Sequence, residues 1–159
     1  MYDKAITSFY KAAEYEEAMP YAQYGLGTVY YDLGEVQASL SGFSESLELI
    51  DVKAPEQQEL LYRIHYNTGI TLFGEGDFSG AANSFREALK ANDKKIDAKR
   101  NLELSLLSQE RQNDSSDRSS PGEGENAGKA ALFEFIYQRE LGQWKSRDWS
   151  EDETGWPDY

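Results

Sequence analysis

The chain has 159 residues, no cysteine and a formal net charge of −13 at pH 7. This charge disfavours nucleic acid and anionic lipid as partners, because each requires a basic face on the protein. The lack of cysteine excludes disulfides, Cys-ligated zinc and thiol catalysis, and no apolar stretch in the sequence reaches the roughly 18 residues of a membrane-spanning helix.

Residues 1–18 carry only the second half of a pattern that recurs later in the chain, namely Ala5-x3-Phe9 followed by Ala12. A lone half-repeat cannot form a helical hairpin, because its partner helix is missing. We therefore expect the sequence to be a fragment that lacks the upstream part of its first repeat. The alternative is a natural single helix that caps the N-terminal end of the array.

Residues 20–53 carry the complete pattern. Its members are Leu26-Gly27-x2-Tyr30, then Ser39-x3-Phe43, then Ser46. We expect two helices here, the first of which ends at Gly34, where a left-handed residue is needed.

Residues 55–95 repeat the pattern with an insertion. Its members are Thr68-Gly69-x2-Leu72, then Ala81-x3-Phe85, then Ala88, with Gly76 in the place of Gly34. Phe43 and Phe85 are 42 residues apart, eight more than the 34 that separate Phe9 from Phe43. The extra residues fall between Asp51 and Leu61, so we expect a helix lengthened by about two turns, with Pro55 in its first turn.

This pattern resembles the tetratricopeptide repeat, whose period is 34 residues and whose units are helical hairpins. The Trp position of the motif holds Gln23 and His65 here, and the closing Pro is also replaced. The resemblance implies an all-α fold: a short solenoid of hairpins with Phe43 and Phe85 filling the space between them. Small residues let the paired helices approach closely, namely Gly27, Gly69, Ala81 and Ala88.

The segment 96–111 is predicted to be a capping helix, with Ile96, Leu102, Leu106 and Leu107 at helical spacing. We expect this apolar side to cover the exposed end of the array. The polar residues 112–128 should form a disordered linker, because they hold too little apolar surface to offset the entropy of ordering.

Residues 129–159 are predicted to form an amphipathic helix followed by an acidic, aromatic tail. An exposed apolar face of this kind requires a cover. We expect the helix to dock on its own array, on a neighbouring molecule's array or on a different protein. The docking residues are Phe133, Ile136, Tyr137, Leu141 and Trp144.

In tetratricopeptide proteins the first helices of the hairpins line a concave groove, and the resemblance places eleven residues of this chain there. Tyrosine suits a peptide groove, because it offers a large contact area and loses little rotamer entropy. Tyr30 is assigned to the core instead, since it matches the motif's core Tyr. The groove residues are Tyr21, Tyr24, Thr28, Tyr31, Arg63, Tyr66, Ile70, Phe73, Asp97, Arg100 and Leu104.

No residue pattern in the sequence indicates catalysis, a cofactor or a metal site. His65, the sole histidine, occupies a core position of the motif, so we interpret it as a packed side chain. Arg63, Asn67, Arg100 and Asn101 imitate part of a clamp for a partner's C-terminal carboxylate, which is a minor alternative.

A second resemblance involves residues 97–104 and residues 131–145, which are similar to segments of tetratricopeptide proteins from bacterial aerotolerance operons. It implies a bacterial, periplasmic or membrane-associated scaffold that works beside von Willebrand factor A-type domain proteins. From the sequence we therefore expect a non-enzymatic scaffold or adaptor that binds a peptide or partner protein in a Tyr-rich groove. The alternative is a structural protein that oligomerises by exchange of its C-terminal helix.

Overall fold

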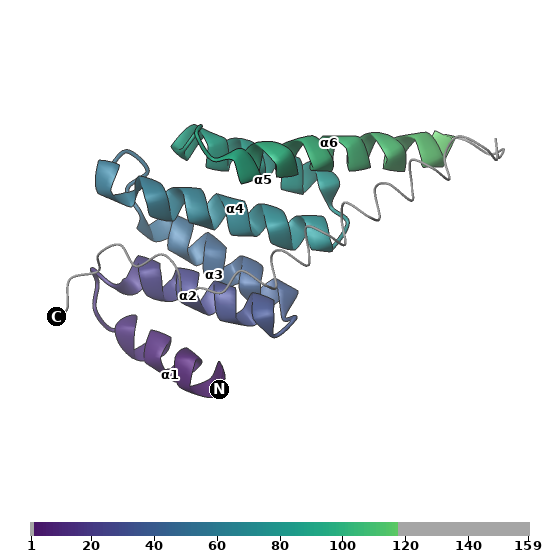
Figure 1. Ribbon diagram of the computed structural model, residues 1–159. Helices are drawn as coiled ribbons and strands as arrows, with labels where there is room; N and C mark the ends of the chain where they lie inside the picture. The colour runs from purple at the N-terminus through teal and green to yellow at the C-terminus, as the bar shows by residue number, and fades with distance from the viewer. Residues whose placement is uncertain (1, 118–159) are drawn as a thin grey trace. The chain divides into compact units, whose positions relative to one another are not determined.

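The chain divides into two units, Met1–Asp117 and Arg118–Tyr159. A computed structural model describes residues 2–117, with side chains through residue 114. These residues form six α-helices and one short 3-10 helix, without a β-strand, so the predicted all-α class is confirmed (Figure 1). The helices are α1 (Tyr2–Ala12), α2 (Met19–Asp32), α3 (Val36–Leu49), η1 (Pro55–Gln57), α4 (Gln58–Gly74), α5 (Phe78–Ala91) and α6 (Ile96–Asp117).

The helices pack against their neighbours in the sequence. The pairs α2 with α3 and α4 with α5 have the most extensive contacts, and α6 packs on α5. Smaller contacts join α1 to α2 and α3 to α4. The helices therefore follow one another in chain order from α1 to α6 across this unit (Figure 1).

In each of the two helix pairs, α2 with α3 and α4 with α5, the first helix ends at a glycine. Gly34 has a φ of 76° and Gly76 a φ of 80°, which confirms the left-handed ends predicted from the sequence. The residues that follow them donate backbone hydrogen bonds back across the helix end, from Glu35 to the Tyr30 carbonyl (2.9 Å) and from Asp77 to the Leu72 carbonyl (3.0 Å). Both glycines thus close their helices with the bonding pattern of a Schellman motif.

Phenylalanine rings occupy the centre of the fold, as predicted. Phe43 is 1% exposed and Phe85 is fully buried. Phe43 faces Gly27 on α2 and also joins a cluster with residues of α4, while Phe85 faces Gly69. A Cβ added at Gly42 would lie 2.7 Å from the backbone nitrogen of Gly27, so α2 and α3 cross with their backbones in close approach. Gly42 was not predicted from the motif.

Helix α4 has 17 residues, three more than the 14 of α2, and the 3-10 helix η1 with Pro55 at its start leads directly into it, so the predicted extension is present but is shorter than two α-helical turns. Helix α3 ends at Leu49 and the chain runs through a turn and the 3-10 helix η1 before α4 begins at Gln58. Pro55 disfavours a helical residue before it, and Ala54 is extended (φ −69°, ψ 120°). The Gln58 amide then donates to the Val52 carbonyl at 2.8 Å, which gives the loop backbone a partner outside any helix.

The prediction for the capping helix is wrong in its orientation. Three predicted core residues are exposed: Ile96 by 63%, Leu106 by 40% and Leu107 by 44%. The buried side of α6 consists instead of small and polar residues, namely Ala98, Asn101, Ser105 and Ser108.

Small side chains allow α6 to lie close to α5, and the two buried serines are satisfied within their own helix. The Ser105 hydroxyl donates to the Asn101 carbonyl at 2.7 Å, and the Ser108 hydroxyl donates to the Leu104 carbonyl at 2.8 Å. Helix α6 also continues to Asp117, so the predicted linker 112–128 is wrong for residues 112–117. Residues 118–128 and the predicted C-terminal helix lie outside the described residues.

Candidate binding surface

We call α2, α4 and α6 the first helices: α2 and α4 each begin a helix pair, and α6 follows the second pair. A repeated tyrosine–asparagine hydrogen bond links them. The Asn67 amide donates to the Tyr24 hydroxyl at 2.9 Å, and the Asn101 amide donates to the Tyr66 hydroxyl at 3.2 Å. The two tyrosines are 42 residues apart and the two asparagines are 34 residues apart, the spacings of the sequence pattern. The same bond thus fixes the register of α4 on α2 and of α6 on α4.

We define the first-helix face as the eleven residues predicted to bind a partner, because they fall at equivalent positions of α2, α4 and α6. Tyr24 and Tyr66 are half-buried members of this face. The Tyr24 ring lies 5.9 Å from the Phe43 ring, and the Tyr66 ring lies 5.7 Å from the Phe85 ring. Burial raises the pKa of the Tyr24 phenol, an effect that the nearby Arg63 charge opposes. These two tyrosines therefore hold helices together.

Four members of the first-helix face are exposed. Tyr21 is 45% exposed, Tyr31 is 41% exposed and the Arg63 side chain is 49% exposed. Arg100 on α6 is exposed as well. Each of the three first helices thus contributes at least one large side chain that is accessible to another molecule.

The remaining five members are half-buried: Thr28, Ile70, Phe73, Asp97 and Leu104. The Thr28 hydroxyl donates to the backbone carbonyl of Tyr24 at 3.1 Å. The Phe73 ring lies edge-on to Phe78 of α5, with a centroid distance of 5.1 Å. These residues form the floor of the face, and their side chains are shared between packing and exposure.

A charged cluster beside the face was not predicted. Glu59 accepts a hydrogen bond from Arg63 at 2.9 Å and also lies 3.6 Å from the Lys95 ammonium. Lys95 in turn lies over the Tyr62 ring, 4.8 Å from its centroid. The four-residue spacing of Glu59 and Arg63 signals their pairing on one helix. Nothing in the sequence signals the approach of Lys95, because it precedes α6 and reaches back to α4.

The tetratricopeptide carboxylate clamp has few free donors here. Asn67 and Asn101 already donate to tyrosine hydroxyls, and Arg63 is paired with Glu59. Three of the four residues that imitate the clamp therefore have partners within the protein. This observation disfavours capture of a C-terminal carboxylate.

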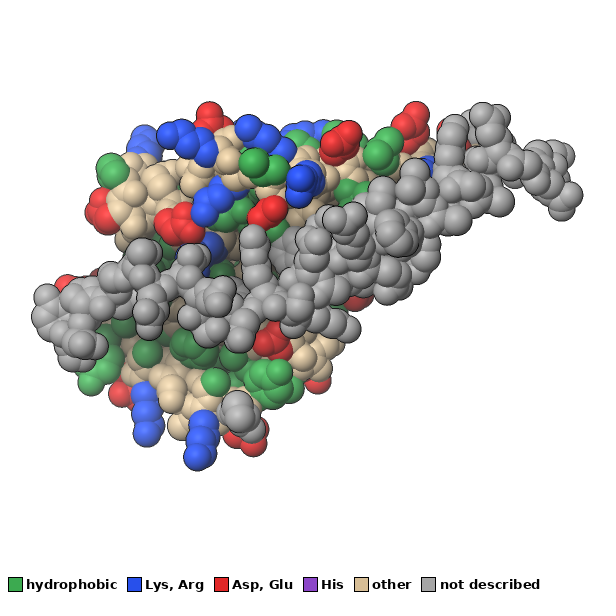
Figure 2. Space-filling view, in the orientation of Figure 1, with side chains coloured by type: hydrophobic (Ala, Val, Ile, Leu, Met, Phe, Trp, Pro, Cys, Tyr) green, Lys and Arg blue, Asp and Glu red, His purple; other side chains and the backbone are tan. Residues whose placement is uncertain are grey.

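The distribution of side-chain types changes along the stack of helices. On the side drawn in Figure 2, hydrophobic side chains lie over the region of α1 and α2, and several lysines and arginines lie over the α6 end. The exposed tyrosines of the N-terminal region include Tyr2, Tyr10 and Tyr15 in addition to the two on the first-helix face. The same view shows lysine or arginine side chains at the α1 end as well, and acidic side chains among the cations at the α6 end, so exposed aromatic rings rather than charge distinguish the N-terminal region.

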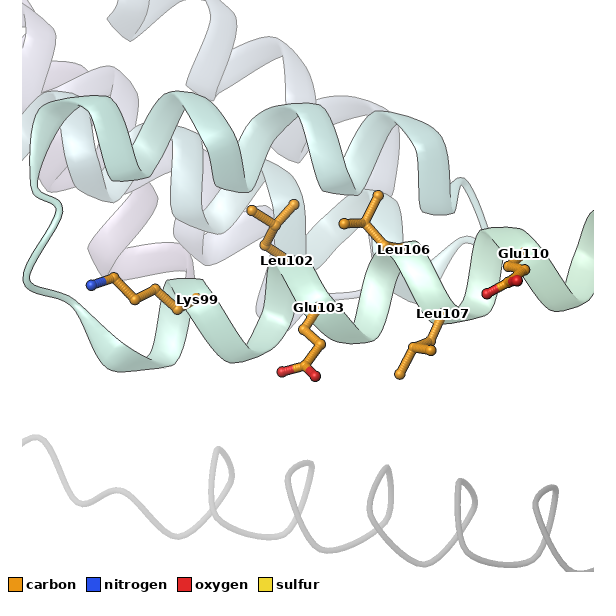
Figure 3. Close-up of a pocket in the computed structure, with 6 residues that line it drawn as sticks. All are labelled: Lys99, Leu102, Glu103, Leu106, Leu107 and Glu110. Atoms are coloured by element: carbon orange, nitrogen blue, oxygen red, sulfur yellow. The ribbon is translucent and has the colours of Figure 1, made fainter.

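A second surface lies on α6, on the side that faces away from its buried residues. We call it the α6 outer face. Its residues are drawn as sticks in Figure 3. Leu102 and Leu106 point to one flank of the helix, whereas Glu103 and Leu107 point to the other. The residues of the α6 outer face are Lys99, Leu102, Glu103, Leu106, Leu107 and Glu110.

His65 is half-buried, in agreement with its interpretation as a packed residue. Burial lowers the pKa of its imidazole, with smaller and opposing effects from Glu87 and Lys90.

Within residues 2–117 no three histidine or carboxylate side chains come together in a way that would hold a metal ion. No helix in the same range has the length and apolar character needed to cross a bilayer.

The five predicted docking residues, Phe133, Ile136, Tyr137, Leu141 and Trp144, lie outside the described residues. No protein-family model and no curated protein matches the chain. The tetratricopeptide and aerotolerance-operon resemblances therefore stay predictions from the sequence.

Proposed function

We propose that the protein is a non-enzymatic scaffold of the tetratricopeptide type, which binds a peptide or a partner protein on its first-helix face. The observation that carries the proposal is the exposure of Tyr21, Tyr31 and Arg63 on helices held in register by the Tyr24–Asn67 bond. Exposed aromatic and guanidinium side chains are typical of binding hot spots. The hydrogen-bonded tyrosines beneath them limit the reorganisation that binding would require.

The proposal is tested with peptides selected on the chain from a random library and then titrated against variants. Tyr31→Ala and Arg63→Ala should each weaken binding about tenfold, because hot-spot residues cost more than 1 kcal/mol on truncation. The matched control is Tyr15→Ala, since Tyr15 is 69% exposed and lies between α1 and α2, off the face. Selected peptides that bind all three variants as tightly as the unaltered chain would show that another surface is used.

The chain's own C-terminal segment is a candidate ligand of the same face, either in cis or in a neighbouring molecule. The support is its sequence pattern, which sets Phe133, Ile136, Tyr137, Leu141 and Trp144 at helical spacing. A synthetic peptide of residues 129–147 provides the probe, titrated against the chain ended at residue 117. Binding that is lost with Tyr31→Ala supports docking on this face, and an absence of binding excludes it.

Two further proposals follow from the same resemblances. Exchange of the C-terminal helix between molecules would make the protein a self-assembling structural element. In that case removal of residues 129–159 should convert the oligomer to a monomer. The partner class implied by the aerotolerance-operon resemblance, a von Willebrand factor A-type domain protein, is a first candidate ligand for titration.

A further inference from the structure

The α6 outer face corresponds to the side of α4 that α5 covers. Asn67 and Asn101, 34 residues apart, make the same hydrogen bond to a tyrosine of the preceding first helix. The same interval relates buried Ile64 to buried Ala98. By this spacing Gly69, which faces Phe85 of α5, corresponds to Glu103 on the α6 outer face.

Glu103 prevents a second hairpin helix from covering α6 in the way that α5 covers α4. Gly27 and Gly69 each allow a phenylalanine ring to press against the helix backbone. A glutamate at the corresponding position fills that space and places a charge there. The molecule that covers the α6 outer face must therefore accept both leucines and charged groups.

The charges along α6 are separated by sign in an unusual direction. Within α6, residues 96–100 contain two cations and one anion, whereas residues 103–114 contain three anions and one cation. The helix dipole favours anions near the N-terminus and cations near the C-terminus, the opposite arrangement. The last turn of α6 has no basic residue. The separation therefore does not stabilise α6 by itself, but it complements a second α6 that runs antiparallel.

We propose that the α6 outer face binds a second copy of this chain, with the two α6 helices antiparallel about a twofold axis between Leu104 and Ser105. Lys99 and Glu110 are eleven residues apart, which is about three turns, so they lie on one side of the helix. In this arrangement Lys99 is level with Glu110 of the second copy, and the pair occurs twice by symmetry. One residue pattern thus supplies both halves of the interface.

The leucines fit the same axis. Leu106 and Leu102 point to the same flank (Figure 3), and the axis brings Leu106 to about 1.5 Å, along the helix direction, from the level of Leu102 of the second copy. Burial of the 40%-exposed Leu106 then contributes to association. Glu103 lies on the other flank with Leu107, where its carboxylate stays at the rim.

The interface consists of one helix face from each copy, which is smaller than a standard protein interface. We therefore expect a weak dimer whose population rises with concentration. In an antiparallel orientation residues 129–147 fit this face less well, because Lys145 and Arg147 would approach the basic end of α6. A parallel orientation would place both cations at the acidic end, so the variants below distinguish this occupant from a second copy. The proposal does not depend on partner binding at the first-helix face.

The test measures the mass of the full 159-residue chain by analytical ultracentrifugation over roughly 1 µM to 1 mM, the range of weak complexes. We expect a dimer that grows with concentration. Glu110→Lys should raise the dissociation constant about tenfold, because it creates two like-charge contacts per dimer. Adding Lys99→Glu to this variant should restore the dissociation constant to within about threefold, since the swapped charges pair again.

Leu106→Lys provides an independent variant and should abolish the dimer. Glu48→Lys on α3 is the control: it makes the same change in net charge at an exposed position of another helix and should leave association unchanged. Circular dichroism of each variant verifies that the helices persist. A chain that stays monomeric throughout, or a dimer that is indifferent to Glu110→Lys and Leu106→Lys, overturns the proposal. The second result would assign association to another segment, such as residues 129–147.

Discussion

Two buried serines occupy positions that the tetratricopeptide pattern gives to small residues, yet their hydroxyl groups differ. The Ser46 hydroxyl donates to the Pro20 carbonyl of α2 at 2.7 Å. The Ser39 hydroxyl is fully buried and has no hydrogen-bond partner among the described residues. A buried polar group without a partner destabilises the fold, whereas a paired one stabilises it modestly.

Ser39→Ala should therefore not reduce stability, whereas Ser46→Ala should. We expect Ser39→Ala to leave the free energy of unfolding unchanged or to raise it by about 1 kcal/mol, and Ser46→Ala to lower it by about 1 kcal/mol. Urea unfolding of the two variants beside the unaltered chain measures both. A loss of stability in Ser39→Ala as large as that in Ser46→Ala would mean that the Ser39 hydroxyl has a partner.

His65 should make stability depend on pH in a defined direction. Burial lowers its pKa below the ordinary value of 6.5, so the unfolded chain takes up a proton before the folded one does. Its contribution is complete above 6.5 and is lost as the pH falls below that value toward the folded pKa. Between about pH 7 and about pH 5 the unaltered chain should lose more stability than His65→Gln.

Carboxylates titrate in both of these chains, so the difference between the two unfolding curves isolates the histidine. Parallel loss of stability in the two chains would contradict the prediction. An exposed His65 with an ordinary pKa would produce that result.

At the scale of elements, glycines decide which helices can approach each other. A Cβ at Gly69 would lie 2.8 Å from the ring of Phe85, which is fully buried, so one of the two would have to shift. A Cβ at Gly74, the last residue of the same helix, would meet nothing within 4 Å. The two glycines of α4 therefore offer a matched comparison between packing and helix propensity.

We expect Gly69→Ala to destabilise the protein by about 1–3 kcal/mol through overpacking, despite the better helix propensity of alanine. Gly74→Ala should be neutral or stabilising by up to about 1 kcal/mol. Chemical denaturation compares the two. Equal effects would indicate that Phe85 can shift, and that close contact between α4 and α5 is not required.

At the scale of the whole molecule, stability should vary along the stack of helices. Phe9, Phe43 and Phe85 hold equivalent positions in the sequence pattern, but their burial differs. Phe43 and Phe85 are at most 1% exposed, whereas Phe9 is half-buried on α1, a helix without a buried residue. A helix that buries none of its residues has few interactions to hold it against the rest, so α1 should open before the helices around Phe43 and Phe85.

Phe85→Ala should therefore cost about 3–5 kcal/mol, and Phe9→Ala less than half of that. Amide hydrogen exchange should show the weakest protection in α1 and the strongest around α4 and α5. Protection of α1 equal to that of α4 would show that the helices unfold as one cooperative body rather than from the end.

The sequence by itself determined the all-α class, the left-handed helix ends at Gly34 and Gly76, and the burial of Phe43 and Phe85. These features follow from local chemistry and from a repeated spacing, both of which are visible along the chain. The resemblance placed Tyr24, Tyr31 and Arg63 on one face alike, and it did not distinguish the exposed Tyr31 and Arg63 from the half-buried Tyr24.

Only the tertiary structure decided the course of residues 50–57 and the orientation of α6. Side-chain hydrogen bonds from Gln58 favour a loop over a longer helix, and the sequence pattern does not reveal them. The leucines of α6 predict a buried side, but the fold buries Ala98 and Ser105 because small residues permit closer contact with α5. The direction in which an amphipathic helix turns is set by the shape of its neighbour, and that shape exists only once the chain has folded.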